Sequence, residues 1–103
     1  MRHQDLLAGF VRLHVLAHAV RAEVWGAWMI EELARHGYQL SPGTLYPMLH
    51  AMEKRGYLTC RVERLGKTAR KLYRATLLGE EGLEEARRRL GELWGEVGSR
   101  GSD

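Results

Sequence analysis

Two histidines, His14 and His18, are residues whose type and spacing could do chemistry. Four positions apart on a helix, they would share one face, where two imidazoles can bind a transition metal. No third ligand follows at a recognisable spacing, so we expect no metal site and no cofactor. The sequence also has no recognisable Ser/His/Asp set, paired carboxylates or glycine-rich phosphate loop, and we expect a protein that is not an enzyme.

The single cysteine, Cys60, alternates with Leu58 and Val62. This period of two predicts a buried thiol on a strand, and it favours that interpretation over a redox sensor. One cysteine cannot form a disulfide within the chain, which favours a reducing, cytoplasmic location. No run of residues is apolar enough to span a membrane and no secretory signal is recognisable, so we expect no membrane partner.

Basic residues are concentrated in one short segment. The chain has 103 residues and a net charge of +3. Residues 54–74 hold eight basic side chains and one acidic one, whereas residues 1–53 and 75–103 carry net charges of −1 and −3. Such a segment is typical of a surface that binds a polyanion. A charged hairpin that is merely solvated is the alternative interpretation.

The elements that would position these residues are mostly helical, and the length predicts one domain. Apolar residues at helical spacing predict helices over residues 5–20, 24–36, 42–55 and 80–97. Ser41 would cap the third helix, and Pro47 inside it predicts a kink. Alternating patterns predict strands over residues 57–63 and 70–76, joined by a loose loop over residues 65–69.

This order of elements is that of a winged helix-turn-helix domain, in which the third helix enters the DNA major groove and the hairpin is the wing. The predicted fold class is therefore mainly α with a small β-hairpin. We expect residues 1–76 to form the DNA-binding domain and residues 77–97 a C-terminal dimerisation helix. Residues 98–103 would be a flexible tail.

The run LSPGTLYPML at residues 40–49, with Met52-Glu53 and Gly56-Tyr57-Leu58 after it, resembles the signature of the PadR family of bacterial transcriptional regulators. The single helix after the wing is similar to the compact subfamily. The resemblance implies a homodimeric repressor that binds an inverted-repeat operator and dimerises through its first and last helices. Ala27 and Leu72 stand where the family usually has Tyr, and the wing has an extra residue.

The expected third helix and wing carry the candidate DNA contacts. Ser41 and Thr44 could instead cap the helix, and each basic side chain could instead be solvated. The outward face of the helix has no Arg, Asn or Gln, so contacts to base edges should be few. The candidate DNA-binding residues are Ser41, Thr44, Tyr46, His50, Lys54, Lys67, Arg70 and Lys71.

Apolar stripes on the first and last helices exceed what one small core can bury, and the last helix has a heptad-like seam. The candidate dimerisation residues are Leu6, Phe10, Leu13, Leu83, Leu90, Leu93 and Val97.

Trp94 supports a second function. Some compact PadR-like regulators bind flat drugs between their subunits, and by resemblance Trp94 could line such a pocket. The alternative function is therefore a small-molecule-sensing, multidrug-binding regulator with a small aromatic effector as partner. Trp94 could equally pack against the first helix of a partner subunit. A winged helix used only for protein contacts is a third interpretation.

Overall fold

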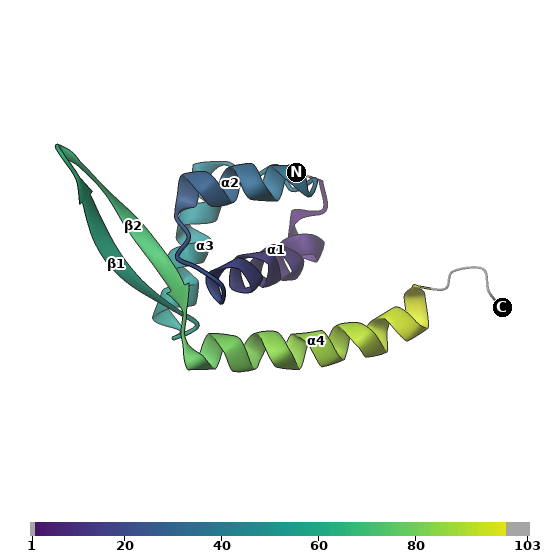
Figure 1. The fold of residues 1–103 in the computed structure, drawn as a ribbon. Coiled ribbons are helices and arrows are strands. Elements are labelled where there is room, and N and C mark those ends of the chain that lie inside the picture. The colour runs from purple at the N-terminus through teal and green to yellow at the C-terminus, as the bar shows by residue number, and fades with distance from the viewer. Residues whose placement is uncertain (1, 99–103) are drawn as a thin grey trace.

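The computed structural model describes residues 2–98, and the expected tail beyond Gly98 lies outside this range. The elements follow the expected order, which confirms the mainly α fold class (Figure 1). They are α1 (Gln4–Ala19), α2 (Gly26–Arg35), α3 (Pro42–Lys54), β1 (Leu58–Leu65), β2 (Thr68–Ala75) and α4 (Leu77–Val97). Within residues 2–98, none of the helices combines the length and hydropathy needed to cross a membrane.

The core lies between α1, α2, α3 and the base of the hairpin (Figure 1). Met29, Leu33, Leu45 and Leu49 are fully buried there. Helix α1 contributes four buried residues to this core, namely Val11, Val15, Leu16 and Ala19. The candidate dimerisation residues Leu6 and Phe10 of the same helix are exposed instead.

The start of α2 differs from the expected one. The helix begins at Gly26, because Val24 is extended and pairs with β2. The amide of Val24 donates to the carbonyl of Tyr73 (2.9 Å), and the amide of Tyr73 donates to the carbonyl of Val24 (2.7 Å). The segment before α2 therefore forms a single antiparallel bridge to β2 at Val24, and this bridge ties the wing to the helices.

Helix α3 is continuous through Pro47, so this proline does not break it. Pro42 occupies the first turn, where its missing N–H costs no helical hydrogen bond. Ser41 occupies the N-cap position, as expected, but its side chain accepts no backbone N–H at the helix start. Its hydroxyl instead donates to Thr44 Oγ1 (3.4 Å). Gly56 follows the helix with φ +88°, a conformation that favours glycine.

The hairpin is longer and tighter than expected. Leu65 pairs with Thr68, so only Gly66 and Lys67 form the turn, and the loose loop over residues 65–69 is wrong. Gly66 has φ +66°, and no positive φ occurs at Lys67, which fits a type II′ turn. This turn matches the right-handed twist of the two strands and keeps the wing regular to its tip.

Helix α4 begins at Leu77, the first residue of the segment expected to form the C-terminal helix and three residues before its apolar periodicity starts. The Thr76 hydroxyl oxygen accepts the amide hydrogen of Gly79 (3.1 Å), and the hydroxyl donates to the carbonyl of Gly56. Thr76 therefore caps α4 and holds its start against the end of α3. The rest of α4 extends past the helical bundle (Figure 1), and its 21 residues span about 31 Å.

Candidate nucleic-acid interface

A groove of about 820 Å³ separates the outer face of α3 from the wing. Its α3 wall is formed by Tyr46, Pro47 and His50. Its other walls come from the start of α2 and from β2. The lining residues are Trp25, Gly26, Ala27, Tyr46, Pro47, His50, Ala69, Arg70, Lys71 and Tyr73.

Tyr46 is half exposed, and its ring covers Gly26 at the first position of α2. A Cβ atom added to Gly26 would lie 1.8 Å from Tyr46 Cε1, so only glycine accommodates the ring there. The phenol is thereby held against α2 while part of it remains open to the groove. His50, one turn later on α3, is 62% exposed, and its Nδ1 lies 3.9 Å from Glu53 Oε1.

Arg70, a candidate DNA contact, binds two other residues of the chain. Its Nε donates to Glu63 Oε1 (2.8 Å), across the strand pair. Its guanidinium carbon lies 4.0 Å from the centre of the Trp25 ring, a cation–π contact. Arg70 thus joins the wing to the segment before α2, in addition to presenting charge to the groove.

A second ion pair joins the same two segments. Arg61 Nη2 donates to Glu23 Oε1 (2.7 Å), and the hydrogen bond from Arg61 lowers the pKa of Glu23. Because Glu23 and Trp25 flank the Val24 bridge, two arginines on one face of the wing, Arg61 and Arg70, bind the residues on either side of it. These contacts fix the angle of the wing relative to α2 and α3.

The lysines remain available. Within residues 2–98, Lys54, Lys67 and Lys71 form no ion pair and are exposed. Lys71 lines the groove, Lys67 lies at the tip of the hairpin and Lys54 at the end of α3. The sequence analysis missed Arg64, which is also exposed. The register places Arg64 and Lys71 on the same face, and the alternation Cys60, Val62, Arg64 was the signal for it.

Most of the candidate dimerisation residues form an exposed apolar surface, but Leu13 is half-buried and Leu83 packs against the core of its own chain. Leu6 is 77% exposed, and the other exposed members are Phe10, Leu90, Leu93 and Val97. A second groove, of about 780 Å³, lies between α1, α4 and the second half of α3, and it includes Leu6, Phe10, Leu13 and Leu93.

Trp94 does not line either groove described within residues 2–98. It is 68% exposed, and its ring lies over Gly98, where an added Cβ would be 2.1 Å from the indole. The rest of α4 carries ion pairs on its solvent face, between Glu84 and Arg87 and from Glu85 to Arg88 and Arg89.

An exposed face of α3 beside a basic hairpin, with α1 and α2 packed behind it, defines a winged helix-turn-helix protein. Residues 15–85 match the transcriptional regulator PadR-like family, and the chain belongs to that family. The transcriptional regulator Rv3488 of Mycobacterium tuberculosis is 53% identical to it over 87 residues, which cover 84% of this chain and 81% of that protein.

Solved structures of the family have the same fold. A PadR family transcriptional regulator from Eggerthella lenta gives a TM-score of 0.82 at 30% identity, covering 91% of this chain and 83% of that one. A PadR-like regulator from Bacillus cereus gives a TM-score of 0.84 at 27% identity, covering 96% and 98%. The family resemblance expected from residues 40–49 is therefore confirmed.

Proposed function

We propose that this regulator binds double-stranded DNA as a homodimer and represses transcription from an inverted-repeat operator. The observation that carries the proposal is the groove between α3 and the wing, with Tyr46 and His50 on one wall and Lys71 on the other. A duplex following this groove would meet a polar helix face and an unpaired cation together. A regulator of transcription acts where the chromosome is, so we propose a cytoplasmic location.

Recognition would rest mainly on phosphates. The exposed outer face of α3 offers Tyr46 and His50 but no Arg, Asn or Gln for bidentate base contacts. The start of α3 offers the hydroxyls of Ser41 and Thr44 and the amide of Gly43, groups that suit a phosphate. The lysines of the wing and of the end of α3 would neutralise further phosphates and set the salt dependence of binding.

Dimerisation follows from the apolar surface of α1 and α4. A monomer would leave Leu6, Phe10, Leu90, Leu93 and Val97 in water. Burying them against a second copy removes this unfavourable exposure, and the resulting two-fold axis would match an inverted repeat.

A footprint on the DNA upstream of the protein's own coding region tests the proposal. We expect two protected half-sites about one helical turn, or about 34 Å, apart, with protection surviving an excess of random duplex. Uniform weak protection that random duplex removes would contradict operator recognition. No binding to either DNA at low salt would favour a winged helix that contacts only proteins.

The groove between α1 and α4 supports a second candidate function, the sensing of a small aromatic effector. It has an apolar lining that includes Phe10, Leu13 and Met48, and a dimer would partly enclose it. Planar dyes titrated against tryptophan fluorescence test this, with Trp94→Phe as the control for a contribution from Trp94. Saturable quenching with weakened operator binding would support an effector, and quenching without any change in DNA binding would contradict it.

A further inference from the structure

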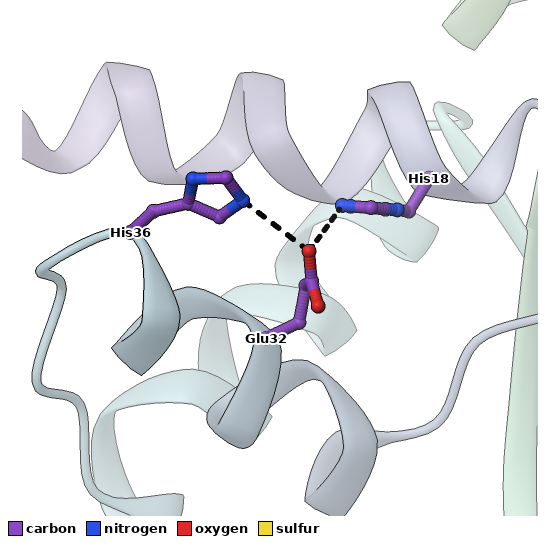
Figure 2. Close-up of side chains that lie close together, drawn as sticks. All are labelled: His18, Glu32 and His36. Carbon is purple, nitrogen blue, oxygen red and sulfur yellow. Dashed lines mark hydrogen bonds and ion pairs between the residues drawn. The ribbon is translucent and has the colours of Figure 1, made fainter.

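Three side chains meet between α1 and α2, outside both grooves described above. His18 lies in α1 and Glu32 in α2, and His36 immediately follows α2 (Figure 2). Glu32 Oε2 lies 3.4 Å from His18 Nε2 and 3.2 Å from His36 Nε2. Each residue offers one ligand atom, and these atoms all lie within 4.8 Å of one another.

These separations fit a tetrahedral metal ion. Two ligands at 2.0–2.1 Å from such a metal lie roughly 3.3 Å apart, close to the two distances that involve Glu32. The remaining distance is between the two imidazoles. The side chain of His36 is 46% exposed and can rotate to shorten it, whereas Glu32, at 16%, is held more firmly.

The surroundings of the cluster favour a fixed geometry. The Trp28 ring meets the His18 ring edge-on, with 5.1 Å between ring centres. Arg35 reaches the other carboxylate oxygen of Glu32, at 3.6 Å, and leaves Oε2 to the two imidazoles. Because α1 contributes one ligand and the α2 region two, the site could form only after the two helices have packed.

We propose that His18, Glu32 and His36 bind one divalent transition-metal ion, with Zn²⁺ as the best fit. Two imidazole nitrogens and one carboxylate oxygen are a ligand set that zinc accepts, and imidazole suits zinc better than it suits Mg²⁺ or Ca²⁺. Three protein ligands leave a fourth coordination position open to water. The bound ion would tie α1 to α2 and so brace the helix that Tyr46 contacts.

Isothermal titration of the purified full chain with Zn²⁺ tests the proposal. We expect saturable binding of one ion per chain, and visible ligand-field bands of tetrahedral geometry when Co²⁺ replaces Zn²⁺. His36→Gln and Glu32→Gln should each weaken Zn²⁺ binding by more than about tenfold, since the loss of an outer-shell partner alone costs 10–100-fold. His50→Gln removes a histidine from α3 instead and should leave Zn²⁺ affinity unchanged.

Thermal melting provides a second readout that does not depend on DNA. At a Zn²⁺ concentration about 100 times the Kd, we expect Tm to rise by about 10 °C for the unmodified chain. The rise should disappear in His36→Gln, which replaces a 46% exposed side chain, and circular dichroism checks that the variant is folded. Zn²⁺ binding that is absent, that is unsaturable, or that persists in His36→Gln and Glu32→Gln would overturn the proposal and leave a hydrogen-bonded cluster.

Discussion

Tyr46 is the candidate base contact whose position depends most clearly on one other residue. Its ring occupies the space where a side chain at Gly26 would be. Gly26→Ala should therefore push the phenol out of place and lower the preference for operator over random DNA by about 1–2 kcal/mol. Competition binding on the two DNAs measures this preference.

The double variant Gly26→Ala/Tyr46→Ala provides the control. If Gly26 acts through the tyrosine ring, the double variant should have the same preference as Tyr46→Ala alone, a non-additive result. Equal losses from Gly26→Ala in both backgrounds would show that Gly26 acts by another route.

The expected burial of Cys60 is only partly right, since the side chain is half-buried and Val62, two residues further along the same strand face, is exposed. This partial burial still affects the reactivity of the thiol. Desolvation by burial, and then the charge of Glu53, raises the pKa of the Cys60 thiol, so less thiolate is present at neutral pH. Alkylation by iodoacetamide at pH 7.5 should therefore be slower for the folded protein than for the chain unfolded in urea. A folded-state rate equal to or above the unfolded rate would contradict an inert thiol.

Within α4, two glycines predict opposite effects of the same substitution. A Cβ at Gly79 would lie 2.3 Å from the backbone carbonyl oxygen of Tyr57, which cannot rotate away, whereas one at Gly91 would meet nothing within 4 Å. Gly79→Ala should lower the free energy of unfolding by about 2 kcal/mol or more. Gly91→Ala should raise it by about 0.5–1 kcal/mol through helix propensity. Urea unfolding measures both, and equal effects would contradict the close approach of α4 to Tyr57.

The elements that the sequence predicted well are those whose signal is local. Apolar periodicity and Pro42 located α3, and alternation located the hairpin. The start of α2 was placed wrongly, at residue 24, and the apolar periodicity of α4 located only its part from residue 80 onward, because contacts distant in sequence decide both starts. Val24 is extended because Tyr73 pairs with it, and Leu77 is helical because Thr76 caps the turn while binding Gly56.

The candidate interface shows the same division. A count of charges identified the wing, but it could not distinguish Lys71, which is unpaired in the described chain, from Arg70, which Glu63 and Trp25 engage. That distinction needs the strand register. Likewise, the pair His14 and His18 was visible in the sequence, but Glu32 and His36 join His18 only when α1 packs against α2.

At the scale of the whole molecule, the apolar residues of α1 and α4 predict an obligate homodimer. Such an interface should exceed about 2,000 Å² in total. Leu90→Asp should shift the sedimentation coefficient from dimer to monomer and lower Tm, because a carboxylate would be buried in the interface. Gly95→Asp adds the same charge on another side of α4, where nothing lies within 4 Å of a Cβ, and should leave the dimer intact. A folded monomer of the unmodified chain at low micromolar concentration would contradict this prediction.

The salt dependence of DNA binding tests most directly whether the wing and α3 form the DNA-binding surface. The logarithm of the binding constant falls linearly with the logarithm of salt concentration, in proportion to the phosphates neutralised. Lys67→Ala and Lys71→Ala should each reduce this slope by about 2 per dimer, one contact from each subunit, on operator and random DNA alike. Arg70→Ala should reduce it less, because Glu63 already pairs with that charge. Arg87→Ala, on the solvent face of α4, is the matched control and should change nothing. Unchanged slopes for both lysine variants would contradict DNA binding through the wing.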